Sequence, residues 1–211
     1  MGAVELVIRE AGGAELDVAA RLATGERGGA EEGWRERFAA DRDDADACFL
    51  VAVLGNGAGV VVGYARARYF EPRPDAPART APAGYYLTGV LVAPAHRRLG
   101  VGEQLTRARM GWAAERAGEL WYFTNAGNRA SLRLHAALGF AEVTRDFVFP
   151  GVTFTGGVGV LCRASLVVAP SGGANGERAA ERLPPLQAIG PGARAEARDA
   201  PPDRNRSGHP R

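Results

Sequence analysis

Apolar and polar positions follow two different periods between residues 4 and 168. Short alternating or continuous apolar runs predict strands, and apolar positions three or four residues apart predict helices. Strands are predicted at 4–9, 48–54, 60–70, 85–92, 120–124, 140–149 and 158–168. Helices are predicted at 14–23, 30–42, 100–117 and 129–138.

Glycine and proline separate these elements. Gly25, Gly28 and Gly29 divide the first two helices, and the Gly-Asn-Gly segment at 55–57 is a hairpin turn between two strands. The proline-rich segment 71–82 is a loop. The resulting order, β-α-α-β-β-β-α-β-α-β-β, predicts an α+β fold in which a mixed sheet carries helices on its faces.

The composition changes near residue 169. The chain has 211 residues, which is long enough for one well-buried domain. Residues 169–211 are rich in Pro, Gly, Ala and Arg and hold few large apolar side chains, so they bury too little surface to offset the entropy of ordering. We therefore predict a folded domain over 1–168 and a disordered tail over 169–211.

Charge and cysteine content bound the function further. The formal net charge is +2, which gives no indication of a nucleic-acid or membrane partner. The N-terminus lacks the continuous apolar core of a signal peptide, and no apolar run approaches the ~20 residues of a membrane span. Cys48 and Cys162 stand in apolar runs without metal-ligand spacing, so we expect buried thiols and no metal. These features predict a cytoplasmic protein.

The densest functional signal lies where the strand ending at Val92 meets the helix beginning near Gly100. The first N–H groups of a helix lack intrahelical partners, and with the helix dipole they bind anions. Gly100 and Gly102 have no Cβ, so a ligand can approach the backbone closely, and Arg97 and Arg98 add charged donors. This arrangement suits a cofactor that carries a diphosphate.

The R-x-x-G-x-G pattern is short, and on its own it leaves open the alternative of a plain strand-turn-helix. The Rossmann pattern G-x-G-x-x-G is absent, because Glu103 and Gln104 follow the glycines without a third glycine. A Walker P-loop is excluded, because the chain contains no lysine.

A second segment follows about thirty residues on. In the predicted helix 129–138, Asn128, Ser131 and His135 share one polar face, which is suited to line a cofactor groove. The neighbouring face is apolar and belongs to the core. Gly139 is a good C-terminal cap, and Phe140 begins the next strand.

With both segments in place, the sequence resembles the GNAT family of acetyltransferases over residues 4–168. The first segment, V-x-P-x-x-R-R-x-G-x-G, matches the family's pyrophosphate-binding motif at Val92, Pro94, Arg97, Arg98, Gly100 and Gly102. The second, N-x-x-S-x-x-L-H-x-x-L-G-F, matches at Asn128, Ser131, Leu134, His135, Leu138, Gly139 and Phe140. The resemblance implies an acyl-CoA N-acyltransferase fold, with a twisted mixed sheet of six to seven strands and four helices on its faces.

The resemblance further implies acetyl-CoA as co-substrate and direct attack of a neutral amine on its thioester. It places a backbone oxyanion donor near Leu91 or Val92, on a strand that splays from 120–124. It also implies that the pantetheine arm occupies the gap between these strands and pairs with backbone groups of Val90 and Val92. The cofactor-binding residues are then Val90, Leu91, Val92, Arg97, Arg98, Leu99, Gly100, Val101, Gly102, Asn128, Ser131 and His135.

The catalytic groups are candidates only. His135 stands where many family members have tyrosine, and its imidazole is a candidate proton donor to the thiolate, against the alternative that it only packs beside the arm. Tyr86 and Glu71 are candidate bases. Further candidates, beside a water chain to bulk solvent, are Tyr85, Thr88, Glu32 and Glu36.

The acceptor pocket is expected between residues 14–46 and 71–84. Four aspartates near it, Asp41, Asp43, Asp44 and Asp46, suit a cationic acceptor such as a polyamine, unless they only cap the helix. We expect a small-molecule amine as partner. Acetylation of a protein or peptide amine, an acetyl-CoA-binding module without catalysis and a nucleotide-binding protein are the alternatives. Members of the family often form homodimers, although no residue here demonstrates one.

Overall fold

The computed structural model describes residues 5–55 and 59–166. A short 3₁₀ turn, Pro94–His96, precedes α3. The elements in chain order are β1 (Leu6–Glu10), α1 (Gly13–Arg27), α2 (Glu31–Asp43), β2 (Ala47–Leu54), β3 (Val60–Phe70), β4 (Gly84–Val92), α3 (Val101–Ala114), β5 (Glu119–Asn125), α4 (Arg129–Ala137), β6 (Ala141–Thr144) and β7 (Gly159–Ser165).

The seven strands form one mixed sheet in the order β1-β2-β3-β4-β5-β7-β6. All neighbouring strands are antiparallel except β4 and β5, which run parallel. The parallel pair is joined by α3, as a crossover between parallel strands requires. The mixed sheet, the four helices and the element order are those predicted from the sequence.

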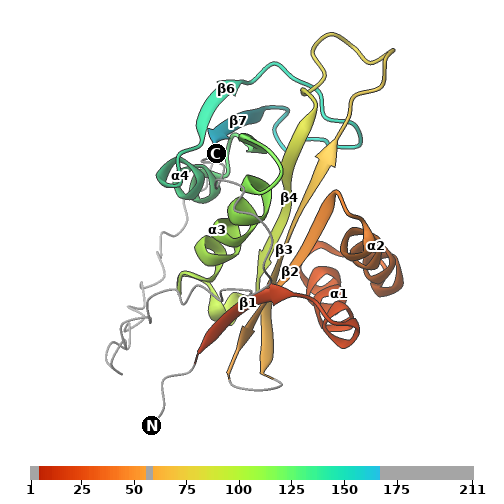
Figure 1. Ribbon diagram of the computed structural model, residues 1–211, viewed down its shortest axis with the longest axis vertical. Helices are drawn as coiled ribbons and strands as arrows, with labels where there is room; N and C mark the ends of the chain where they lie inside the picture. Colours follow the sequence, from red (N-terminus) through yellow and green to blue (C-terminus); the bar gives the residue numbers. More distant parts are fainter. Residues whose placement is uncertain (1–4, 56–58, 167–211) are drawn as a thin grey trace, which may run out of the picture. The chain divides into compact units, whose positions relative to one another are not determined.

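Helices cover both faces of the sheet, α1 and α2 on one side and α3 and α4 on the other (Figure 1). Leu16 and Ala19 of α1 lie three residues apart and are buried with Phe49 of β2 in one core cluster. Val101 and Leu105 of α3 lie four residues apart and belong to a second cluster on the opposite face. Fully burying each leucine contributes about 1.5–3 kcal/mol, so these stripes fix which side each helix covers.

The central strand β4 changes partner along its length. On one side it pairs with β3 through Val92, whereas on the other side it pairs with β5 only at Tyr86 and Leu87. Beyond Leu87 the two parallel strands therefore separate. The register against β3 also shifts at Thr88, which is an extra residue in β4 and so forms a bulge. The sheet is thereby open on one edge of residues 88–92, as the family resemblance implies.

The predicted strand 140–149 is too long. β6 ends at Thr144, and the chain then leaves the sheet. Phe147 and Phe149 pack instead with Tyr86 and Trp121 in a third apolar cluster. Their side chains therefore stabilise a loop that covers the sheet, which a pattern of apolar residues cannot distinguish from a strand.

Two predicted segments lie outside the described residues. These are the centre of the 55–57 turn and the tail from residue 169 onward. In the part of the chain that the structure describes, no helix combines the length and the apolar character needed to cross a bilayer.

Candidate active site

The turn before α3 has the backbone conformation of an anion site. Arg98 and Gly100 adopt left-handed φ angles of 62° and 77°. The first helical hydrogen bond runs from the N–H of Gln104 to the carbonyl of Gly100 at 3.0 Å. Within 5–55 and 59–166, the backbone N–H groups of residues 98–103 donate to no other part of the chain. Six consecutive donors are thus free to bind a ligand.

The space around the two glycines of this turn is open. A Cβ added at Gly100 would meet no atom within 4 Å, and one at Gly102 would meet only Val92 at 3.9 Å. The glycines therefore leave open room in front of the helix N-terminus. Two buried polar atoms farther along the expected cofactor path, Thr88 Oγ1 and His135 Nε2, also lack a hydrogen-bond partner among the described residues. The residues present accordingly suit acetyl-CoA.

Arg97 is oriented differently from Arg98. Its Nε donates to the carbonyl of Val92 at 3.0 Å, and its guanidinium forms an ion pair with Glu26 of α1. Arg97 thus ties the turn to both β4 and α1. Arg98 is exposed and adopts a positive φ, which is unusual for a residue with a Cβ.

Carbonyl directions define the open edge of β4. The Val90 carbonyl accepts a hydrogen bond from Arg27 Nη2 at 2.9 Å, and the Val92 carbonyl accepts from Arg97, so both point away from β3. The Leu91 carbonyl points at Gly63 of β3, where an added Cβ would lie 2.7 Å from it.

In an extended strand, the N–H and C=O of one residue point to the same side. Val90 and Val92 therefore present their amides to the gap beside β5. Leu91 does not, because its backbone faces β3. Of the two residues expected to carry the oxyanion donor, only Val92 is placed for it, and Val90 joins it.

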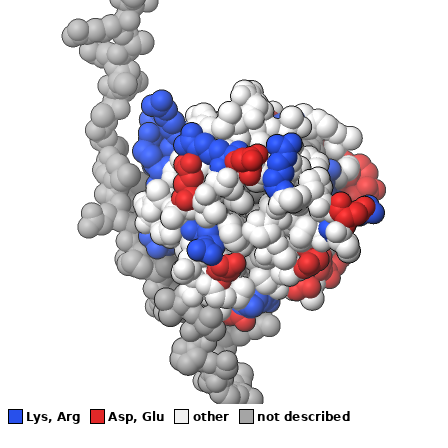
Figure 2. Space-filling view, turned by 90° about the horizontal axis from the view of Figure 1, so that it is seen from above, with Lys and Arg blue, Asp and Glu red and all other residues white. Residues whose placement is uncertain are grey.

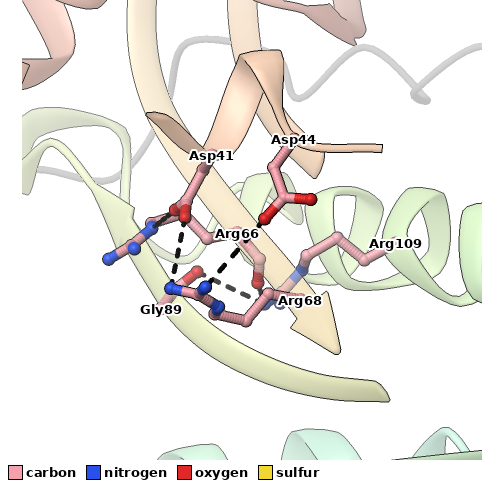
Figure 3. A network of polar contacts seen from close by, with 6 residues as sticks. All are labelled: Asp41, Asp44, Arg66, Arg68, Gly89 and Arg109. Atoms are coloured by element: carbon pink, nitrogen blue, oxygen red, sulfur yellow. Dashed lines mark hydrogen bonds and ion pairs between the residues drawn. The ribbon is translucent and has the colours of Figure 1, made fainter. Parts of the chain in front are cut away.

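The bulge in β4 rests on a buried arginine. Arg109 of α3 is 1% exposed, and its Nη1 donates to the carbonyls of Arg66 and Gly89 at 3.0 and 3.3 Å (Figure 3). Its other donors reach the Leu105 carbonyl and Thr106 Oγ1. Burial lowers the pKa of Arg109 to about 10, so the side chain remains charged at neutral pH. A cation thus lies directly behind the open edge of β4.

The four aspartates near α2 are engaged within the protein. The buried Asp41 forms ion pairs with Arg66 and, at 3.8 Å, with Arg68 Nη1 (Figure 3). Asp44 lies 4.0 Å from Arg68 Nη2. Of the remaining pair, Asp43 bonds Arg42, and Asp46 accepts from the hydroxyl of Tyr85.

The aspartates therefore do not form the open anionic site expected for a cationic acceptor. The surface seen from above likewise shows acidic and basic side chains interspersed (Figure 2).

The second motif forms a compact polar cluster on α4. Asn128 caps the helix, because its side chain accepts from the N–H of Ser131 at 3.2 Å. Ser131 Oγ lies 2.6 Å from the hydroxyl of Tyr122. The Tyr122 ring stacks on the imidazole of His135, with ring centroids 3.6 Å apart and planes 2° from parallel. These contacts hold His135 in one orientation.

The protonation of His135 follows from its surroundings. Nδ1 lies 2.9 Å from the Ser131 carbonyl, which only accepts, so Nδ1 carries the hydrogen and Nε2 carries none. Burial lowers the pKa of His135 to about 4, so the imidazole is neutral at pH 7. This form has no proton to donate through Nε2. The geometry therefore favours the packing role over the expected role of proton donor.

The two candidate bases are not placed for that role. Tyr86 is fully buried, its hydroxyl donates to the Pro82 carbonyl at 2.6 Å, and burial raises the pKa of its phenol. Glu71 follows Phe70, which pairs with Gly84 at the end of β4 opposite to the gap, and its carboxylate accepts from Tyr69.

The other candidate bases are also engaged or turned away. Tyr85 packs on the α3 side with its hydroxyl on Asp46. Glu32 and Glu36 are exposed, on the side of α2 opposite to the buried Phe38. Thr88 lies at the bulge with its hydroxyl buried and unpartnered among the described residues, but a hydroxyl is a weak base.

Two site residues were not identified from the sequence. Arg109 carries a readable signal, because it follows Val101 and Leu105 at spacings of four and so stands on the buried stripe of α3. Arg27 carries none, because it is one of many exposed arginines, and only the fold brings it to Val90.

Comparison with known proteins gives a match to one family model. The sequence model of the acetyltransferase (GNAT) family matches residues 16–140, more than half of the chain. A search of curated proteins gives no sequence match. In the described residues there is no cluster of three side chains able to hold a metal ion.

Solved structures share the fold at low sequence identity. A ribosomal-protein-alanine N-acetyltransferase from Brucella melitensis is 24% identical, with a TM-score of 0.57 over 76% of this chain and 99% of that one. The ribosomal-protein-S18-alanine N-acetyltransferase from Escherichia coli is 17% identical, with a TM-score of 0.56 over 81% and 100%. A spermidine N-acetyltransferase chimera from Vibrio cholerae and hSSAT is 14% identical, with a TM-score of 0.55 over 76% of this chain and 95% of that one.

Proposed function

Because the chain belongs to the acetyltransferase (GNAT) family, we propose that it transfers the acetyl group of acetyl-CoA to the primary amine of a small molecule. Bound acetyl-CoA would supply an activated acyl thioester for direct attack by the amine. The amine nitrogen would bond to the acetyl carbon as the C–S bond breaks, and the CoA thiolate would leave and take a proton from water. The observation that carries the proposal is the position of the six free amides of residues 98–103 directly after the open edge of β4. The six amides would bind the diphosphate, and the open edge of β4 would bind the thioester end of acetyl-CoA.

The roles of the chain's own groups follow from this placement. The amides of residues 98–103 hold the diphosphate, and Gly100 and Gly102 permit its close approach. The outward N–H groups of Val90 and Val92 are donors for the pantetheine arm and for the oxyanion that develops at the thioester. Arg109 holds the bulge that directs these amides into the gap.

We expect no side chain to act as the base. Glu26, the carboxylate that contacts Arg97 of this turn, is held in that ion pair. The amine would instead arrive neutral or lose its proton to water. The pH midpoint of kcat/KM should then follow the amine pKa of each acceptor, whereas a fixed midpoint would require a protein base.

The direct test is release of free CoA thiol from acetyl-CoA in the presence of amino acids, polyamines, aminoglycosides and peptides. Turnover that depends on a small amine supports the proposal. Turnover with peptides alone would move the assignment to a protein amine. Binding of CoA without turnover for any amine would indicate a binding module and contradict the proposal.

A further inference from the structure

Arg27, the last residue of α1, lies at the reacting end of the gap. Its Nη2 donates to the Val90 carbonyl at 2.9 Å, on the side of β4 that β5 has left. The N–H of Val90 is a candidate oxyanion donor. The guanidinium of Arg27 therefore contacts the backbone of Val90, the residue beside which the acetyl group is expected to bind.

No carboxylate of the described residues forms an ion pair with Arg27, whereas neighbouring acidic side chains are engaged. Glu26 pairs with Arg97, and Glu31 pairs with Arg21 at 3.5 Å. Asp41 and Asp43 of α2, and Asp44 directly after it, are also paired with arginines, as described above. The charge presented at this end of the gap is thus positive.

The contact between Arg27 and Val90 is weaker than the one the guanidinium can make with an anion. A neutral carbonyl accepts one hydrogen bond here, whereas a carboxylate binds the planar fork of arginine through two parallel, charge-assisted bonds. The Val90 carbonyl is also the group expected to pair with the pantetheine arm. Arg27 is therefore available to another acceptor once that arm is in place.

We propose that the acceptor is a small α-amino acid or a close analogue, and that Arg27 binds its carboxylate. This inference rests on the proposed function. Because the guanidinium lies so close to the reacting position, the acid group must stand on the same carbon as the amine or on the next one. A polyamine would bring a second positive charge toward Arg27 and is disfavoured.

The experiment compares α-amino acids with their carboxamides, which keep the amine and side chain but lose the negative charge. Acetyl-CoA and each acceptor are given to the wild type, to Arg27→Gln and to the matched control Arg21→Gln on the same helix. We expect Arg27→Gln to lower kcat/KM for the acids about tenfold or more, mainly through KM, and to change the amides less than about twofold. The ratio between variants cancels the different basicity of the two amines.

Two further readouts separate the possible failures. Arg21→Gln should behave as the wild type, and the affinity for CoA should be the same in all three proteins. Equal losses for acids and amides in Arg27→Gln, or a wild type that prefers amides or polyamines, would overturn this inference and leave the proposed function standing. Acetylation of no amine at all, with CoA still bound, would overturn both.

Discussion

At the scale of single residues, His135 illustrates how burial sets protonation. The folded protein holds its pKa at about 4, whereas an unfolded chain has the ordinary value near 6.5. As the pH falls between these values, His135 therefore becomes protonated in the unfolded state but stays neutral in the folded state. The stability contributed by His135 is complete above about pH 6.5 and is lost toward about pH 4.

This difference gives a measurable pH dependence. We expect the free energy of unfolding of the wild type to fall by up to about 3 kcal/mol more than that of His135→Phe between about pH 7 and pH 4. Chemical denaturation at a series of pH values measures both curves. All other titrating groups are common to the two proteins, so parallel curves would show that His135 is not held neutral.

The same side chain tests the chemistry. A neutral imidazole without a hydrogen on Nε2 contributes little as an acid, so His135→Phe should keep kcat within about threefold of the wild type. Steady-state kinetics with a small amine measures this directly. A loss of about a hundredfold, typical of a missing general acid, would restore the proton-donor role expected from the sequence.

Arg109 is a positioning residue in this account. In Arg109→Met the Arg66 and Gly89 carbonyls lose their donor, which costs about 1–3 kcal/mol of stability. Without this support the bulge should hold the amides of Val90 and Val92 less well oriented toward the gap. We therefore expect kcat to fall about tenfold while acetyl-CoA affinity changes less than about threefold. Arg109→Lys, which keeps the charge without the fork, should be intermediate. The exposed Arg107→Met on the same helix is the control.

A kcat of Arg109→Met equal to that of the wild type in folded protein would contradict the positioning role. Equal losses in kcat and in acetyl-CoA affinity would instead indicate general disruption of the fold.

At the scale of elements, the start of α3 is the most specific feature. Gly100 adopts a φ of 77°, which costs a residue with a Cβ about 1–2 kcal/mol, and its side-chain position faces open space. Gly100→Val should therefore weaken acetyl-CoA binding at least about tenfold. Isothermal titration measures the change.

The matched control is Gly111→Ala, at an exposed position farther along α3 where an added Cβ meets no atom within 4 Å. It should bind as the wild type and gain about 0.5–1 kcal/mol of stability. Unchanged binding in Gly100→Val would show that the turn does not hold the diphosphate.

Elements could be predicted from the sequence where one face of each is buried. The stripe of α1 and the continuous apolar run of β2 determine their type and place. The segment after Thr144 could not be placed, because Phe147 and Phe149 are buried by a loop that packs on the sheet, and their apolar pattern resembles that of a strand. The bulge at Thr88 also has no local signal, since it depends on a buried arginine from another element.

The candidate site divides in the same way. The free amides at the start of α3 depend on local sequence, so Gly100 and Gly102 could be predicted, whereas the Asn128 cap was not. Roles that depend on what lies across the fold were not. Tyr86 is excluded as a base because its hydroxyl donates to the Pro82 carbonyl. Arg27 belongs to the site because it contacts Val90, which lies 63 residues later in the chain.

At the scale of the whole domain, the site arises where the two parts of the sheet separate. β4 belongs to β1–β3 through long antiparallel pairing and to β5–β7 through only two residue pairs. The helices on the two faces then place α1 and α3 at the same opening, Arg27 from one and the free amides from the other (Figure 1).

The most direct test of this account is amide hydrogen exchange with and without acetyl-CoA. We predict slower exchange in two segments, residues 98–103, whose N–H groups gain the diphosphate, and residues 88–92, whose open edge gains the arm. The exposed face of α2 should be unchanged. Equal exchange rates at residues 98–103 in the free and the bound protein would contradict the account.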